Sequence, residues 1–269
     1  MNKISQILGE NRKHSTCSLI PFITAGYPDK NSTIKALYQL DRQGADIIEL
    51  GIPYIDALAD GPIIQEASQV ALKQGIYIDD VLSILNEVTS ILKSPIIIFT
   101  YYNPILVRGI DKFIMEIYNN GAQGLIVPDL PIEETDYLMY LCNLFSIELI
   151  LFIAPTSSNK RISSILSKSS KCIYLVSSTG VTGMRSHLNM NINYLSNYIK
   201  SQTDKLVIIG FGISNSLQAS YVSKWNIDGI VIGSAFINIL SNFSMENNYL
   251  DELGSFCKEI KLAIANKDL

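Results

Sequence analysis

Several groups on which enzymes commonly rely are scarce in this sequence of 269 residues. Histidine occurs only twice, as His14 and His187, and no spacing pairs the two. A metal-dependent aldolase needs a cluster of histidine and carboxylate ligands, so this class is excluded. There is also no GxSxG motif, and a hydrolase built on a nucleophile elbow is excluded with it.

The sequence has no lysine late in an apolar run and no closely spaced pair of cysteines, the two arrangements in which these residues commonly act in catalysis. Lys171 and Lys205 stand only at the beginnings of apolar runs, and no lysine lies late in one. A Schiff-base aldolase, which needs a desolvated lysine, is therefore excluded. The four cysteines are scattered without a CxxC pair, and we expect them to be reduced and mostly structural. We expect no metal site in this chain.

Long apolar runs and basic stripes are also absent. No run approaches the roughly 20 apolar residues of a membrane span. The beginning, MNKISQILGENRKHS, lacks the apolar core of a secretory signal, and we expect the cytoplasm or a plastid stroma as the location. The formal net charge is -4, so nucleic acid is not an expected partner.

Short apolar runs, by contrast, recur along the whole chain. They cover residues 18–26, 45–52, 95–102, 124–130, 148–155, 172–178, 205–213 and 229–236. Near-continuous Val, Ile and Leu is typical of strands that are buried on both faces of a parallel sheet. Helical patterns lie between the runs, and three of them close with a glycine near the expected C-cap, at Gly44, Gly75 and Gly121. Eight such units favour a (β/α)8 TIM barrel, of the α/β class, over an open doubly wound sheet.

Two segments are additions to the alternating pattern of one strand and one helix. About 15 residues precede the first run, and residues 75–93 add helical sequence between the second and third runs. Both predict extra helices packed on the barrel, one at the N-terminus and one after strand 2. No linker-like segment interrupts the chain, so we expect one barrel domain over residues 1–269. The active sites of such barrels lie at the carboxyl ends of the strands.

The stretch DIIELGIPYIDALADGP, residues 46–62, puts Glu49 late in the second run and Asp60 in the loop after it. Burying an unpaired carboxylate is costly, so Glu49 requires either a partner or a function. No Lys or Arg lies inside a predicted strand to pair with it. If Ile47 and Glu49 point inward, Glu49 lies near the top of the barrel interior, and we interpret it as a functional acid.

Three glycine-containing segments follow the late strands. They are TGVTG at 179–183, GFGIS at 210–214 and IGSAF at 232–236. The last two follow strands seven and eight, where such barrels often bind phosphate. Glycine lets backbone N–H groups approach an anion, and a helix that begins near Ser234 would aim its first amides at the same point.

These exclusions leave one class of reaction, which is acid–base chemistry by carboxylates on a phosphorylated substrate. Apolar and aromatic residues near the strand ends can line a pocket for such a substrate. They are Phe22, Phe99, Tyr101, Ile126, Phe152 and Tyr174.

Seven segments, taken together and in this order, resemble the α subunits of tryptophan synthase. They are PFITAGYP, ADIIELGIPYIDALADGPIIQ, TYYNPI, GLIVPDLP, STGVTG, GFGIS and IGSAF. The resemblance runs nearly from end to end, and its most specific part is ELGIPY followed by LADGP. It implies cleavage of indole-3-glycerol phosphate to indole and glyceraldehyde 3-phosphate without a cofactor in this chain. It also implies an α2β2 tetramer in which indole passes to a β subunit that holds pyridoxal phosphate.

The resemblance also implies roles for individual residues. Glu49 and Asp60 fall on the catalytic glutamate and aspartate of the family. The substrate-binding positions fall on Phe22, Tyr101, Phe152, Tyr174 and Thr182. The phosphate-binding positions fall on Gly183, Gly212, Gly233 and Ser234. The loop that faces the β subunit contains Pro53, Asp56 and Ala57.

Two departures from the family pattern are visible. Ile55-Asp56-Ala57 stands where Ser-Asp-Pro is common, and Ile132 stands where a second proline usually follows PDLP. The first departure bears on communication with the partner more than on the chemistry. Three other interpretations stay open: a stand-alone lyase that releases free indole, a catalytically idle subunit that only activates its partner, and another phosphate-binding barrel such as an isomerase of the same pathway.

Overall fold

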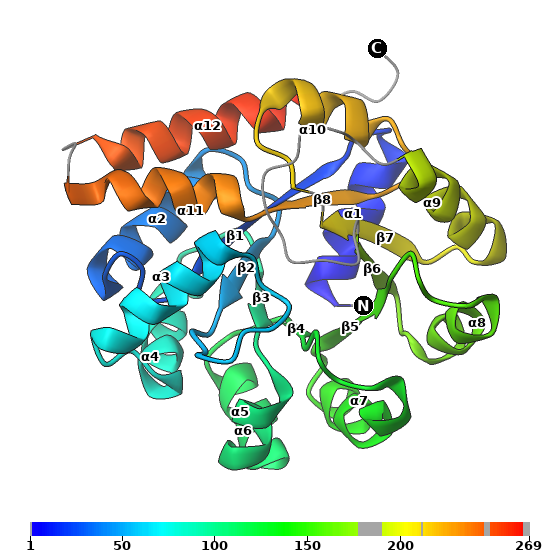
Figure 1. The fold of residues 1–269 in the computed structure, drawn as a ribbon, viewed down its shortest axis with the longest axis horizontal. Coiled ribbons are helices and arrows are strands. Elements are labelled where there is room, and N and C mark those ends of the chain that lie inside the picture. Colours follow the sequence, from blue (N-terminus) through cyan, green and yellow to red (C-terminus); the bar gives the residue numbers. More distant parts are fainter. Residues whose placement is uncertain (1, 177–189, 211, 245–247, 266–269) are drawn as a thin grey trace.

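The computed structural model describes residues 2–176, 190–210, 212–244 and 248–265, and its strands form a closed parallel barrel. Each strand pairs with the next along the chain, and β8 closes on β1 (Figure 1). The strands are β1 (Ser18–Thr24), β2 (Ile48–Gly51), β3 (Ile96–Phe99), β4 (Gly124–Ile126), β5 (Glu148–Ile153), β6 (Cys172–Val176), β7 (Leu206–Gly210) and β8 (Gly229–Ile232). Each apolar run contains one of these strands, so the predicted (β/α)8 barrel is confirmed.

Helices surround the ring of strands (Figure 1). They are α1 (Lys3–Lys13), α2 (Lys30–Arg42), α3 (Pro62–Lys73), α4 (Ile78–Val88), α5 (Tyr102–Arg108), α6 (Ile110–Asn119), α7 (Thr135–Leu144), α8 (Asn159–Lys168), α9 (Met190–Gln202), α10 (Ser216–Ser223), α11 (Ser234–Ser241) and α12 (Tyr249–Ala263), with short 3₁₀ turns η1 (Ile132–Glu134) and η2 (Asn242–Ser244). The two predicted additions are α1, before β1, and α4, between α3 and β3. None of these helices is long and apolar enough to cross a membrane.

Local features of the sequence explain where helices end. Gly44, Gly75 and Gly121 follow α2, α3 and α6 with φ angles of 99°, 79° and 89°. This left-handed conformation is one that glycine adopts without a steric penalty, as the C-cap prediction required. All four cysteines are free and buried, in agreement with their predicted structural role.

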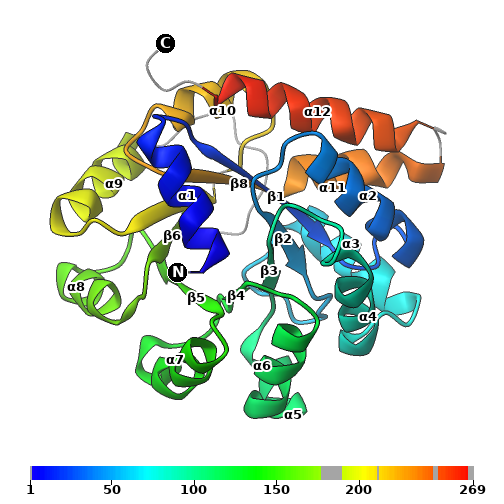
Figure 2. The ribbon, with the colours of Figure 1, turned by 180° about the vertical axis from the view of Figure 1, so that it is seen from behind.

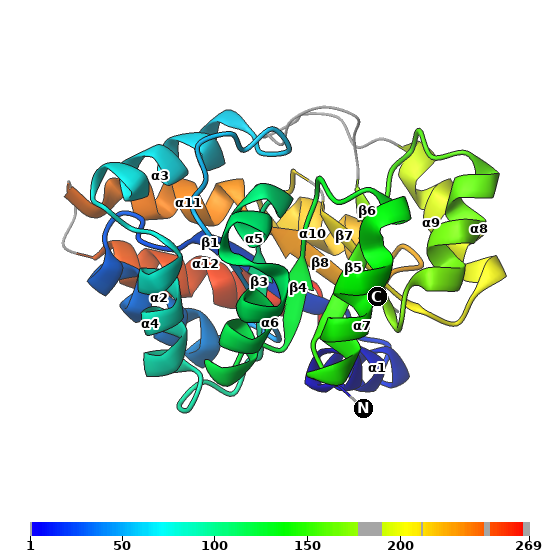
Figure 3. The same ribbon diagram turned by 90° about the horizontal axis from the view of Figure 1, so that it is seen from below.

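Helix α1 lies across the end of the barrel at which the strands begin, opposite the loop that follows β2 (Figures 2 and 3). Polar side chains of α1 contact three carboxylates near the starts of β2, β5 and β8. These contacts are Asn11 Nδ2 to Asp46 at 3.0 Å, Ser5 Oγ to Glu148 at 3.1 Å and Arg12 Nε to Asp228 at 3.4 Å. We call Asp46, Glu148 and Asp228 the basal carboxylates.

Glu148 shows how completely a basal carboxylate is satisfied. One of its oxygens accepts hydrogen bonds from Ser170 Oγ at 2.7 Å, Lys171 N at 2.9 Å and Cys172 N at 3.1 Å. The other accepts from Ser5 Oγ. Two of these donors are backbone groups at the start of β6, so the carboxylate joins β5, β6 and α1.

The other two basal carboxylates join strands in the same way. Asp46 accepts from the backbone N–H of Leu19 at 2.7 Å, and Asp228 accepts from that of Val207 at 2.7 Å. Asp228 also pairs with the ammonium of Lys200, and both side chains are almost fully buried. This end of the barrel is therefore closed by α1 and by paired charges, which leaves the opposite end for a ligand.

Candidate active site

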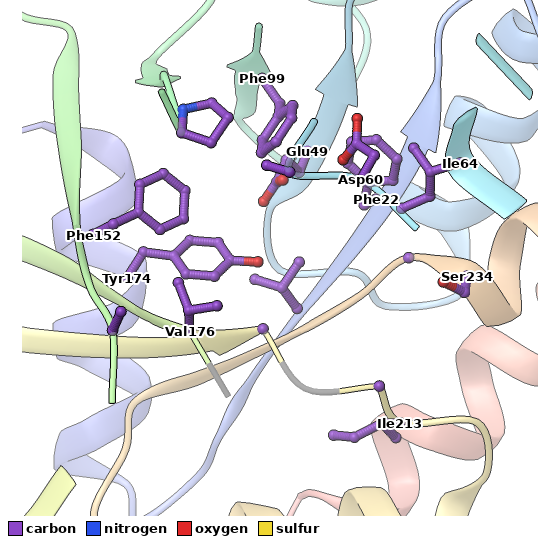
Figure 4. A pocket seen from close by; sticks show the side chains of 17 residues that line it. Phe22, Glu49, Asp60, Ile64, Phe99, Phe152, Tyr174, Val176, Ile213 and Ser234 are labelled. Carbon is purple, nitrogen blue, oxygen red and sulfur yellow. The ribbon is translucent and has the colours of Figure 1, made fainter. Parts of the chain in front are cut away.

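The carboxyl ends of the strands surround a cavity of about 270 Å³. Figure 4 shows Glu49, Tyr174, Phe152 and Phe99 directed into one space, with Ser234 at its far side. The described residues that line it are Phe22, Glu49, Ala59, Asp60, Ile64, Phe99, Pro128, Phe152, Ala154, Tyr174, Val176, Gly210, Gly212, Ile213, Val231, Gly233 and Ser234.

Glu49 projects from β2 into this cavity and is only 1% exposed. Its Oε2 has no hydrogen-bond partner among the residues that the structure describes. Burial, and secondarily the nearby charge of Asp60, raises the pKa of Glu49 to about 8. A carboxyl group with such a pKa carries a proton at neutral pH and can donate it.

Asp60 reaches the same cavity from a turn between β2 and α3. The N–H of Asp60 donates to the carbonyl of Ala57 at 3.1 Å, which closes the turn. Burial raises the pKa of Asp60 to about 6, and a hydrogen bond from the Tyr101 hydroxyl opposes the rise. The two acids therefore differ in pKa, so that at neutral pH Glu49 is protonated while Asp60 is ionised.

Tyr101, a predicted substrate-binding residue, lies behind Asp60, away from the cavity wall. It is 2% exposed, and the residues that line the cavity do not include it. Its hydroxyl accepts a hydrogen bond from the N–H of Ala59 at 3.0 Å and interacts with the Asp60 carboxylate. Its ring packs against Tyr54 and Phe99. Tyr101 thus contacts the acid.

Two aromatic pairs shape the apolar part of the cavity. Phe22 and Phe99 meet edge to face with their ring centroids 5.6 Å apart, and Phe152 and Tyr174 lie with centroids 4.7 Å apart. Phe22 lies level with Glu49 in the register of β1 and β2. Burial and the charges of Glu49 and Asp60 hold the pKa of the Tyr174 hydroxyl well above its usual value, so it stays protonated. The walls suit a flat apolar ring.

Glycine is required at two positions beside these rings. A Cβ on Gly210 would lie 2.2 Å from the Tyr174 hydroxyl oxygen. A Cβ on Gly51 would lie 2.7 Å from Cζ of Phe22. A side chain at either position would force the neighbouring ring, which lines the cavity, to move.

Gly212, Gly233 and Ser234, the described residues that the resemblance assigns to phosphate binding, line the other end of the cavity. Ser234 is the first residue of α11 and Gly233 is its N-cap, so the start of this helix, where the first amides lack intrahelical partners, lies at this end. The described residues that line the cavity include no Lys or Arg. An anion here would be held by backbone amides and a hydroxyl. Thr182 and Gly183, also predicted for the substrate and phosphate, lie outside the described residues.

The loop predicted to face a partner is only partly exposed. Asp56 is exposed, whereas Pro53 and Ala57 are buried. Ile55, where the chain departs from the family pattern, and Leu58 are 70% and 84% exposed. The turn at 57–60 directs Ala57 inward, and this brings its apolar neighbours to the surface.

Sequence reasoning missed several residues of the cavity wall. Val176 and Val231 lie at the ends of β6 and β8, and their position at strand ends was the available signal. Ile64 comes from the first turn of α3, which the sequence pattern did not connect with the site. Ile126 was expected at the pocket, but it is fully buried and does not line the cavity. Within the described residues, no group of three His, Cys, Asp or Glu side chains could hold a metal ion.

Known proteins with the same pattern share this architecture. The sequence profile described as "Tryptophan synthase alpha chain" matches residues 8–265. The tryptophan synthase alpha chains of Gracilaria tenuistipitata var. liui and Antithamnion sp. are 62% and 58% identical over 264 residues, covering 98% of this chain and 97% and 99% of theirs. The solved structure of tryptophan synthase subunit alpha from Legionella pneumophila str. Paris has a TM-score of 0.89 at 30% identity and covers 98% of each chain. The chain therefore belongs to the tryptophan synthase alpha chain family.

Proposed function

We propose that Glu49 and Asp60 carry out the reaction of this family, in which a lyase cleaves indole-3-glycerol phosphate to indole and glyceraldehyde 3-phosphate. The observation that carries the proposal is the Glu49 carboxyl group, which is buried, has an oxygen without a partner among the described residues and faces an apolar cavity beside a second acid. The aromatic pairs suit the indole ring, and Gly212, Gly233 and Ser234 suit the phosphate.

Glu49 handles both protons of the cleavage. In its protonated form it donates a proton to C3 of the indole ring, and positive charge develops at the ring nitrogen. The resulting carboxylate then accepts the proton of the C3′ hydroxyl as the bond from C3 to C3′ breaks. The bonding electron pair returns to the ring, indole leaves, and the hydroxyl oxygen becomes the aldehyde oxygen. Glu49 ends the cycle protonated.

Asp60 stabilises the charge that develops at the indole N1–H. A fixed carboxylate in a site of low dielectric favours this cation without reorganisation at the moment of reaction. Asp60 acts as the anion, so activity falls as the pH drops through its pKa of about 6. Glu49 acts first as an acid, so activity falls as the pH rises through its pKa of about 8. A bell-shaped profile between these values is expected.

Two features favour a partner subunit: the apolar product indole, and the exposed apolar side chains beside the β2–α3 loop. Family membership implies a β subunit as partner, and indole, being neutral and apolar, would be lost by diffusion without one. The exposed side chains of Ile55, Tyr77 and Val107 line a hollow of about 590 Å³ beside the β2–α3 loop. We infer that a pyridoxal-phosphate-dependent β subunit covers this face in an α2β2 tetramer.

The similarity to chains from Gracilaria and Antithamnion also favours the plastid stroma over the cytoplasm as the location. The location, the stoichiometry and the cofactor of the β subunit do not alter the chemistry proposed for the cavity.

The proposal is tested by indole release from indole-3-glycerol phosphate with the purified chain, with and without a β subunit. We expect slow release by the chain alone and faster release with β. Asp60→Asn should reduce kcat by about 10²–10³-fold and leave KM nearly unchanged. Wild-type turnover in that variant would reduce Asp60 to a structural residue. Release that β neither binds nor accelerates would favour the stand-alone lyase.

A further inference from the structure

Residues 57–60, which carry Asp60 into the cavity, are held from two sides by side chains that lie outside the cavity wall. From α3, the amide nitrogen Nε2 of Gln65 donates to the carbonyls of Ala57 and Asp60, each at 3.1 Å. These two carbonyls stand at the two ends of the turn that the Asp60 N–H closes. Gln65 therefore fixes both corners of the turn with one amide group.

The second attachment comes from the other side, after β3. The Tyr101 hydroxyl accepts from the N–H of Ala59 at 3.0 Å, inside the same turn, and interacts with the carboxylate of Asp60. Tyr101 is held in turn by ring contacts with Tyr54 and Phe99. One attachment thus orients the backbone of the turn, and the other orients its carboxylate.

We propose that Gln65 and Tyr101 are positioning residues that form a clamp on the 57–60 turn and set the position of the Asp60 carboxylate for catalysis. The need for a clamp follows from the surroundings of the turn. Leu58 and Ala59 are exposed, so packing holds this segment on one side only. An acid that must meet a developing charge has to be placed within about 0.5 Å, and an error of about 1 Å can cost about 10²-fold in rate. This inference rests on the proposed role of Asp60.

The first test compares two identical substitutions in the same helix. Gln65→Met keeps side-chain length and helix propensity but removes the donor, and Gln69→Met makes the same change at an exposed position one turn later. Steady-state kinetics on indole-3-glycerol phosphate should show a kcat about 10- to 100-fold lower in Gln65→Met, with KM changed by less than about 3-fold. Gln69→Met should equal the wild type. Equal kcat values in the two variants would overturn the clamp.

The second test uses the pH profile, which a merely structural defect would not move. The Tyr101 hydrogen bond favours the ionised form of Asp60, so its loss should raise the pKa of that carboxyl group above about 6. Tyr101→Phe should therefore shift the acid limb of kcat/KM to higher pH, and Tyr102→Phe, at the next position, should leave it in place. An unshifted acid limb in Tyr101→Phe would contradict the clamp, and this test stands even if Gln65→Met folds poorly.

A double variant and one further control separate the clamp from the proposed function. Both residues act through one turn. The loss of transition-state stabilisation in the double variant should therefore be smaller than the sum of the losses in Gln65→Met and Tyr101→Phe. Fully additive losses would show that the two residues act independently and would overturn the inference. If Asp60→Asn keeps wild-type turnover, the proposed function fails; if it loses turnover while both clamp variants keep theirs, only the clamp fails.

Discussion

Glu49 and Glu148 are both glutamates in barrel strands, and they are 1% and 3% exposed. Glu148, at the beginning of β5, accepts four hydrogen bonds from side chains and backbone amides. Glu49, in β2 and at the other end of the barrel, has an oxygen that no described residue satisfies. Two buried glutamates of one barrel thus differ in their hydrogen bonds: Glu148 is fully satisfied, whereas Glu49, within the described part of the chain, is not.

The difference separates two uses of a buried acid. At the base, donors and cations compensate the cost of burial, and the carboxylates hold strands and α1 together. At the top, no described residue satisfies one oxygen of Glu49, and the cost of burial appears as a raised pKa that suits proton transfer. The lack of a partner for one Glu49 oxygen among the described residues lowers stability there and leaves the acid available for proton transfer.

The largest expected effect comes from making one substitution at both ends. Glu49→Gln should lower kcat by about 10²–10⁴-fold, since the amide keeps the shape but cannot transfer the proton. Glu148→Gln should keep kcat per folded molecule and lower the free energy of unfolding by about 1–3 kcal/mol, since it loses charge-assisted hydrogen bonds. Indole release and urea unfolding of both variants measure the contrast. An inactive Glu148→Gln or an active Glu49→Gln would break it.

The next effect concerns the buried ion pair at the base. Asp228→Asn removes the counter-ion of Lys200, whose side chain is 4% exposed, and leaves a buried ammonium next to a neutral amide. We expect a loss of about 3–5 kcal/mol in the free energy of unfolding. Residual kcat per folded molecule should stay unchanged, because the pair lies far from the cavity. A fall in kcat without a fall in stability would show that the two ends are coupled.

A smaller effect links Glu49 to the pH dependence of stability. Its folded pKa of about 8 lies above the ordinary value of 4.5, so its contribution is fully present below pH 4.5 and is lost as the pH rises toward 8. Glu49→Gln removes this loss and should be more stable than the wild type by about 3 kcal/mol at pH 7. Thermal unfolding at pH 4.5 and pH 8 should show the Tm difference only at the higher pH. Equal differences at both would mean that Glu49 is not the titrating group.

The smallest effect tests the anion site at the start of α11. Inorganic phosphate should stabilise the wild type by about 1 kcal/mol at concentrations several times its Kd. Ser234→Asp puts a negative charge at this end of the cavity and should abolish the stabilisation. Ser164→Asp, at an exposed position in α8, should keep it. Equal stabilisation in all three chains would place the phosphate elsewhere.

The sequence predicted the parts of this molecule that depend on local pattern. Apolar runs located the strands, C-cap glycines located helix ends, and Glu49 stood out because it interrupts an apolar run. The pattern did not predict the role of the basal carboxylates. Each of them stands at the edge of an apolar run, where acidic residues are common.

Residues whose roles depend on distant partners could not be predicted in this way. Glu148 is understood only through Ser5 and Cys172, and the strand pattern says nothing of those pairings. Gln65 gives no signal in an amphipathic helix, because its two acceptors are backbone carbonyls of a turn whose shape the sequence did not specify. Tyr101 was expected at the substrate for its place at a strand end, whereas its hydroxyl lies against Asp60.

The contacts of α1 with the base also bear on the order in which the chain folds. Ser5 and Glu148 are 143 positions apart, and Arg12 donates to the carbonyl of Asp204, 192 positions later. At about 5–20 residues per second, a ribosome needs about 10–40 s to synthesise the second interval. Helix α1 is thus synthesised well before its partners near β7 and β8. It can dock fully only after the last strands have entered the barrel. Protection of its amides during synthesis would report barrel closure.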